Sequence, residues 1–79
     1  MIILYSKQAK KFLEKQDKKT QLRIISAIEQ IPQGDIKKMV NSSFYRLRVG
    51  DYRIIFDKNG TVISIYKIDN RGEVYKRGN

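Results

Sequence analysis

Apolar residues recur at helical spacing in the first half of the chain. A short apolar run at residues 2–5 predicts a strand, and Ser6 is a favourable N-cap for the segment that follows it. There, up to about Gln16, apolar side chains return every three to four residues, at Ala9, Phe12 and Leu13. This spacing predicts a first helix with one apolar face.

A second helix is predicted to begin after Asp17, whose carboxylate suits an N-cap. Its apolar face is broad and consists of Leu22, Ile24, Ile25, Ala27, Ile28 and Ile31. Pro32 and Gly34 stop it, because proline cannot continue a helix and glycine favours its end. We therefore expect two antiparallel helices joined by a tight turn.

In the second half of the chain, apolar residues recur at every second position, the spacing of a strand. Three segments rich in β-branched and aromatic residues are predicted strands: residues 44–49, 52–56 and 62–68. The separators Gly50-Asp51 and Asn59-Gly60 are both typical of two-residue hairpin turns. Residues 35–43 show no clear period and are predicted to be a connector, and residues 73–77 to be a short strand or tail.

Together these elements predict an α+β fold. The three strands form an antiparallel meander, the N-terminal strand adds at an edge, and the helix pair covers one face. Because no repeat, linker or change of composition divides the chain, we expect residues 1–79 to form a single domain.

The charge of the chain is strongly positive. Seventeen Lys and Arg stand against eight Asp and Glu, a formal charge of +9 that favours a polyanion such as nucleic acid. A solubilising surface, or one that meets an acidic protein partner, is the alternative. No cysteine, signal peptide or membrane span is evident, so we expect a soluble, cytoplasmic protein with no membrane role.

Arginines gather on one face of the predicted meander. Because side chains alternate along a strand, Arg46 and Arg48 point the same way as Phe44. A two-residue turn then places Arg53 opposite Arg48. Directly opposed like charges need an anion or nearby acids, and few acids stand close in sequence. The arrangement favours an anion site over ordinary solvated side chains.

Guanidinium groups match the geometry of phosphate but are poor general bases. With no histidine in the chain, proton transfer is left to Tyr75, to Glu73 or Asp69, to a lysine, or to water. The acids are too scattered for a metal-dependent nuclease, and no cofactor motif is present. The strand aromatics Tyr45, Tyr52, Phe56 and Tyr66 are expected to pack, whereas Tyr75, beside Lys76 and Arg77, either packs or contacts RNA.

Two motifs resemble those of the RelE branch of the RelE/ParE toxin family. They are the run FYRLRVGDYRIIF at residues 44–56 and the run RGEVY at residues 71–75. The order of elements agrees along the whole chain. The resemblance implies a type II toxin that cleaves messenger RNA in the ribosomal A site. It acts without metal or cofactor, through attack of a ribose 2′-hydroxyl on the adjacent phosphate.

The resemblance also implies roles for individual residues. Arg53 and Arg71 would bind the scissile phosphate, and Tyr75 would orient or activate the 2′-hydroxyl or stack on a base. Arg46 and Arg48 replace lysines found in other members and would hold the RNA backbone. The expected catalytic set is Arg48, Arg53, Arg71 and Tyr75, and the expected RNA-binding set is Arg46, Arg48, Lys76 and Arg77. An arginine cannot easily replace a lysine base, so the general base stays open.

The expected partners are the ribosome, A-site messenger RNA and a cognate antitoxin, with promoter DNA contacted only through the antitoxin. An antitoxin segment would cover exposed apolar surface, and an acidic part of it could occupy the arginine face. Two alternatives remain. One is a ParE-like inhibitor of DNA gyrase, and the other is a basic nucleic-acid-binding module without catalysis.

Overall fold

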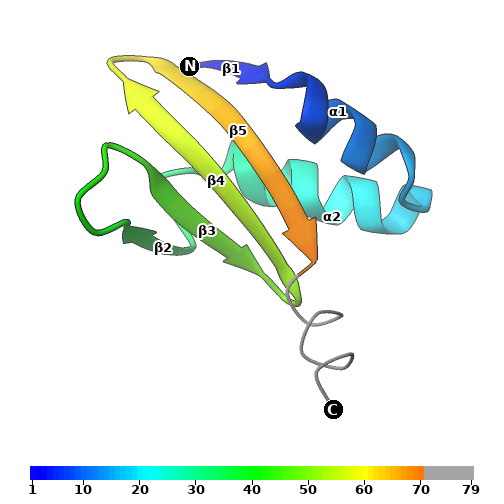
Figure 1. Ribbon diagram of the computed structural model, residues 1–79. Helices are drawn as coiled ribbons and strands as arrows, with labels where there is room; N and C mark the ends of the chain where they lie inside the picture. The colour runs from blue at the N-terminus through cyan, green and yellow to red at the C-terminus, as the bar shows by residue number, and fades with distance from the viewer. Residues whose placement is uncertain (71–79) are drawn as a thin grey trace.

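A computed structural model describes residues 1–70 of the chain. Two helices and five strands follow one another in it (Figure 1). Their bounds are β1 Ile2–Tyr5, α1 Lys7–Glu14, α2 Lys18–Glu29, β2 Asp35–Lys38, β3 Tyr45–Val49, β4 Tyr52–Asn59 and β5 Val62–Asn70. The predicted order of strand, helix pair and meander is confirmed. Residues 73–77, predicted to be a strand or tail, lie outside the described residues.

The five strands form one sheet in the order β1-β5-β4-β3-β2. β1 runs parallel to β5, while the other neighbours are antiparallel. The addition of the N-terminal strand at an edge is therefore confirmed, as is the α+β class. β4 and β5 are longer than their predicted segments because they stay paired as far as Asn59 and Val62. The turn predicted at Asn59-Gly60 is therefore wrong by one residue, since the two-residue loop is Gly60-Thr61 and the positive φ, 61°, falls on Gly60.

The connector predicted at residues 35–43 is wrong in its first part. β2 occupies Asp35–Lys38 and pairs antiparallel with β3. It escaped the pattern because it is a short edge strand in which only Ile36 is half-buried and its neighbours are exposed. Such a strand has no alternation of buried and exposed positions to detect.

The helix pair begins and turns as the sequence predicts. Ser6 Oγ accepts a hydrogen bond from the backbone N–H of Ala9 at 3.1 Å, and Asp17 Oδ1 accepts one from Thr20 at 2.8 Å. Both N-caps are thus confirmed. Gln21 Nε2 donates to the carbonyl oxygens of Leu13 and Gln16, which ties the end of α1 to the start of α2.

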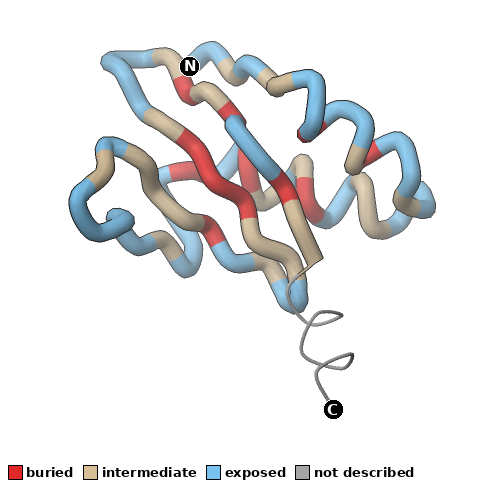
Figure 2. The backbone as a smooth tube through the Cα atoms, in the orientation of Figure 1, coloured by how far each residue is buried: buried red, intermediate tan, exposed pale blue. Residues whose placement is uncertain are grey.

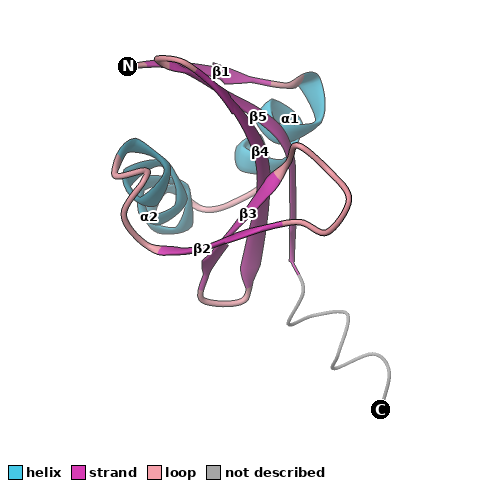
Figure 3. Cartoon of the chain, turned by 90° about the vertical axis from the view of Figure 1, so that its left-hand side faces the viewer, coloured by secondary structure: helices cyan, strands magenta, loops and turns pink. Residues whose placement is uncertain are grey.

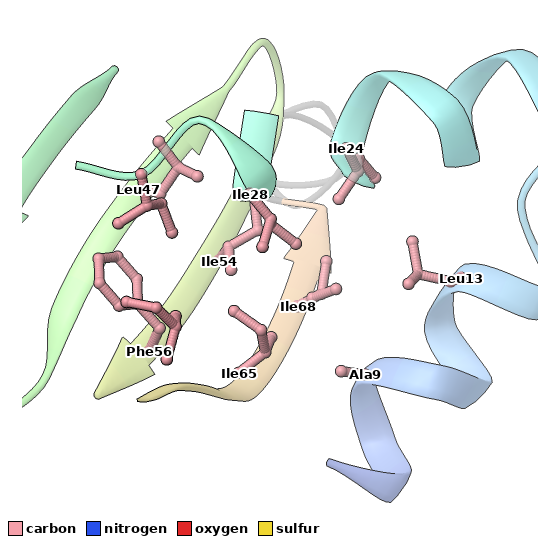
Figure 4. Close-up of a cluster of buried hydrophobic side chains, with 11 residues drawn as sticks. Ala9, Leu13, Ile24, Ile28, Leu47, Ile54, Phe56, Ile65 and Ile68 are labelled. Atoms are coloured by element: carbon pink, nitrogen blue, oxygen red, sulfur yellow. The ribbon is translucent and has the colours of Figure 1, made fainter. Parts of the chain in front are cut away.

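The core lies between the helices and one face of the sheet. Ala9 and Leu13 of α1 and Ile24 and Ile28 of α2 point toward strand residues that include Ile54, Phe56, Ile65 and Ile68 (Figure 4). Burial is densest along the central strand β4 (Figure 2). A side view shows α2 alongside this face (Figure 3).

The other face of the sheet, called here the second face, carries no helix from residues 1–70. No described helix is long and apolar enough to cross a membrane.

Candidate nucleic-acid interface

The strand register arranges the second face in rows that run across the strands. The first, called here the arginine row, crosses β2, β3, β4 and β5 and consists of Asp35, Arg48, Arg53 and Asp69. The second, called the mixed row, consists of Lys37, Arg46, Ile55 and Lys67 on the same four strands. Neighbouring rows are about 6.7 Å apart, since a strand rises about 3.3–3.4 Å per residue.

Arg48 and Arg53 lie directly opposite each other, as the two-residue turn predicts. The expectation that few acids reach them is wrong. Arg53 donates through Nε to Asp69 Oδ1 at 3.2 Å and through Nη2 to Oδ2 at 2.8 Å. On the other side, Asp35 is the cross-strand neighbour of Arg48. Acids from β2 and β5, distant in sequence, therefore flank the opposed arginines.

Arg46 occupies a different environment in the mixed row. It is half-buried opposite Ile55, which is only 7% exposed although it lies on the second face. The Nε atom of Arg46 is buried without a hydrogen-bond partner among the described residues. Buried donors are nearly always paired in folded proteins, so this guanidinium is placed where an added acceptor would stabilise it.

Two cations of the mixed row were not among the predicted site residues. Lys37 pairs with Arg46 across β2 and β3, and Lys67 lies opposite Ile55. Both are exposed. Strand alternation places Lys67 on the same face as Asp69, and this signal could have found it. Lys37 gave no signal, because β2 was not predicted.

Three of the four strand aromatics pack as expected. Tyr45 stacks on Phe56 with ring centroids 5.4 Å apart, and Tyr52 meets the ring of Phe12 edge-on at 6.0 Å. Tyr66 differs, since it contacts Phe44 at 5.1 Å and yet is 59% exposed. A β-bulge explains its position. Register shifts between Ile55 and Phe56, so Tyr66 has no cross-strand partner in β4.

The remaining predicted site residues lie outside the described part of the chain. They are Arg71, Glu73, Tyr75, Lys76 and Arg77. Within residues 1–70, no three Asp, Glu, His or Cys side chains gather as metal ligands would.

The fold is shared with a class of small toxins. Over 96% of this chain and 99% of the other, the structure matches a chain of the RelB–RelE antitoxin–toxin complex from Methanococcus jannaschii, with 28% identity and a TM-score of 0.72. It also matches a chain of the RelE–RelB complex from Pyrococcus horikoshii, with 30% identity and a TM-score of 0.73. That match covers 90% of this chain and 94% of the other. A chain of the RelBE2 complex of Mycobacterium tuberculosis shares the fold with a TM-score of 0.68 and 17% identity. That match covers 89% of this chain and 96% of the other.

Residues 3–75 match the family described as ParE toxin of type II toxin–antitoxin system, parDE. The chain belongs to this family, within the RelE/ParE superfamily, and is a toxin of the type II class. No curated protein matches it at a significant level.

Proposed function

We propose that the chain is a RelE-type endoribonuclease that cleaves messenger RNA in the ribosomal A site. The observation that carries the proposal is the second face, where Arg46, Arg48 and Arg53 lie on adjacent strands with Lys37 and Lys67 beside them. A phosphate backbone that follows the two rows would meet cations at both, with guanidinium forks suited to phosphate oxygens.

The proposed reaction needs no group beyond the RNA and the protein. The ribose 2′-hydroxyl attacks the adjacent phosphate, the bond from phosphorus to the 5′ oxygen breaks, and a 2′,3′-cyclic phosphate and a 5′-hydroxyl remain. Arg53 and Arg48 offset the charge that develops on the phosphate, together with Arg71. Tyr75 orients or activates the 2′-hydroxyl, while Arg46, Lys76 and Arg77 hold the RNA.

An antitoxin is the proposed regulatory partner. The matched proteins of Methanococcus jannaschii and Pyrococcus horikoshii are described as antitoxin–toxin complexes. We infer that this toxin also binds an antitoxin, and that acidic antitoxin side chains meet the arginine row. Promoter DNA would be contacted by the antitoxin alone, and the toxin would act in the cytoplasm on translating ribosomes.

The test adds purified protein to a programmed translation reaction and maps the ends of the messenger RNA. Cuts within A-site codons, ending in 2′,3′-cyclic phosphate, are expected. Arg53→Ala should lower the cleavage rate by about 10²–10³. Lys11→Ala removes an exposed cation from α1 and should leave the rate unchanged. Intact messenger RNA at protein concentrations equal to those of the ribosomes would overturn the proposal.

Inhibition of DNA gyrase is the second candidate, because the matching family is described by ParE toxins. A supercoiling assay with purified gyrase distinguishes the two functions. Loss of supercoiling with intact messenger RNA would favour the gyrase inhibitor, and cleavage without loss of supercoiling would favour the ribonuclease.

A further inference from the structure

A hollow lies on the second face beside the mixed row. It has a volume of about 300 Å³ and is lined by Leu4, Tyr5, Ser6, Phe44, Asp57, Ser64, Ile65 and Tyr66. The register explains how these residues meet. Asp57 on β4 pairs with Ser64 on β5, which pairs in turn with Leu4 on β1. On the other side of β4, Tyr45 pairs with Phe56, so the next residue pair in the same register is Phe44 and Asp57. The hollow thus forms a third row, one step beyond Arg46.

The walls of the hollow are apolar and aromatic. Tyr66 and Phe44 contact each other at 5.1 Å, and Leu4 and Tyr66 are 54% and 59% exposed. The Phe44 backbone is fixed at both ends, since its N–H donates to Ser42 Oγ and its carbonyl accepts from Met39. An exposed aromatic ring on a rigid strand is the usual platform on which a nucleobase stacks.

The hollow also carries polar groups. Asp57 is half-buried, and its Oδ1 accepts a hydrogen bond from the N–H of Lys58 at 2.8 Å. Ser64 is its cross-strand partner on β5 and also lines the hollow. A carboxylate accepts hydrogen bonds and donates none, so at the exocyclic position it pairs with the amino N–H of cytosine or adenine and repels the carbonyl oxygen of uracil.

We propose that this hollow is a nucleobase subsite that prefers a base with an exocyclic amino group to uracil. The proposal rests on the proposed function, since the base is that of a nucleotide whose phosphate lies on the mixed row. Tyr66 and Phe44 stack on the base, and Asp57 accepts the amino N–H. The charge of the neighbouring row supports RNA over the apolar side chain of a partner protein, because Arg46 and Lys67 suit a phosphate.

The test compares cytosine with uracil, which differ by an amino group in place of a carbonyl. Short 2′-O-methyl oligocytidylate and oligouridylate, which cannot be cleaved by 2′-hydroxyl attack, are titrated against the full chain. Wild type should bind oligocytidylate about fivefold or more tightly than oligouridylate. Asp57→Asn should bring the ratio close to one, because an amide also donates to the uracil carbonyl.

Three further variants separate stacking from loss of fold. Tyr66→Ala should weaken binding of both oligonucleotides by about tenfold, and Tyr66→Phe should retain it. Leu22→Ala removes an equally exposed apolar side chain from α2, where it is 57% exposed, and should change neither affinity. An unchanged ratio in Asp57→Asn, with wild-type binding intact, would overturn the subsite and leave the proposed ribonuclease standing. Wild type that binds neither oligonucleotide would overturn the subsite, while the proposed function would still be decided by the translation assay. Tyr66→Ala that weakens only antitoxin binding would identify a protein-docking surface instead.

Discussion

At the scale of single residues, Asp69 controls what Arg53 can bind. Its two carboxylate oxygens accept both hydrogen bonds that Arg53 Nε and Nη2 donate, in an ion pair whose side chains are 32% and 27% exposed. A phosphate would need the same donors. The carboxylate therefore competes with RNA for Arg53, and its negative charge also repels the RNA backbone.

The first prediction follows from this competition. Asp69→Asn should increase affinity for single-stranded RNA by about three- to fivefold, since it removes one negative charge beside the arginines. It should also lower the free energy of unfolding by about 1 kcal/mol, the cost of losing a partly exposed ion pair. Fluorescence titration with RNA and urea unfolding measure the two effects.

Glu14→Gln is the matched control for Asp69→Asn. It removes one negative charge from an exposed position on α1, away from the second face. If it increased RNA affinity as much as Asp69→Asn does, net charge rather than release of Arg53 would explain the result.

The residue pairs of the site differ in how far the sequence could predict them. The Arg48–Arg53 pair could be predicted, because a two-residue turn leaves one register. The Arg53–Asp69 ion pair could not, since it depends on how β4 and β5 align beyond a bulge. The same bulge places both Ile65 and Ile68 in the core, three positions apart, and alternation alone cannot anticipate this.

At the scale of elements, Gln8 joins α1 to the sheet. Its Nε2 donates to the carbonyl of Ile68 and its Oε1 accepts the N–H of the same residue, both at 2.9 Å. β1 pairs with β5 only as far as Ile65, so the Gln8 amide takes the place of a strand neighbour at Ile68. The backbone of Ile68 is thereby satisfied where the parallel strand ends.

The second prediction tests this link. Gln8→Ala should lower the free energy of unfolding by about 1–3 kcal/mol, because it leaves a backbone donor and acceptor without their partner. In Gln8→Glu the carboxylate can still accept the N–H of Ile68 but cannot donate to its carbonyl. This variant should therefore lower the free energy of unfolding by less than Gln8→Ala does. Urea unfolding measures both, and hydrogen exchange at Ile68 should be faster in Gln8→Ala. Equal stability in all three proteins would contradict the role given to Gln8.

The third prediction concerns the N-cap of α2. Hydrogen bonds from the side chain and then the backbone of Thr20, with a contribution from the charge of Lys19, lower the pKa of Asp17 below its ordinary value of 3.8. A lowered folded-state pKa means that the ionised cap stabilises the fold above that ordinary value. This stability is lost as the pH falls through the folded-state pKa.

Asp17→Asn isolates this effect, since asparagine caps a helix about as well but does not titrate. Urea unfolding of both proteins between about pH 7 and about pH 3 should show a larger loss of stability in wild type. If the two proteins lost stability in parallel, ionisation of Asp17 would not strengthen the cap.

Both helix caps could be predicted from the sequence, because a cap depends on a few adjacent residues. The Gly50-Asp51 turn could be predicted for the same reason, whereas the second turn was predicted one residue early, at Asn59-Gly60 instead of Gly60-Thr61. β2 could not, because its pairing with β3 depends on contacts between strands and its own side chains are mostly exposed. Local signals therefore predicted the elements that local interactions determine.

At the scale of the whole molecule, positive charge is not confined to the second face. The helix pair and its turn carry Lys7, Lys10, Lys11, Lys15, Lys18, Lys19 and Arg23. The net charge of +9 therefore does not by itself select the face that RNA contacts. What distinguishes the second face is geometry, since the strand register fixes its cations in rows.

The fourth prediction uses salt dependence to separate fixed cations from diffuse charge. Arg48→Ala and Lys11→Ala each lower the formal charge by one, and both side chains are exposed. A cation that neutralises one phosphate of single-stranded RNA contributes about 0.7 to the slope of log affinity against log salt. Arg48→Ala should reduce the slope by this amount and weaken binding, and Lys11→Ala should keep the wild-type slope. Equal slopes in the two variants would mean that RNA responds to total charge, and the arginine row would then have no special part in binding.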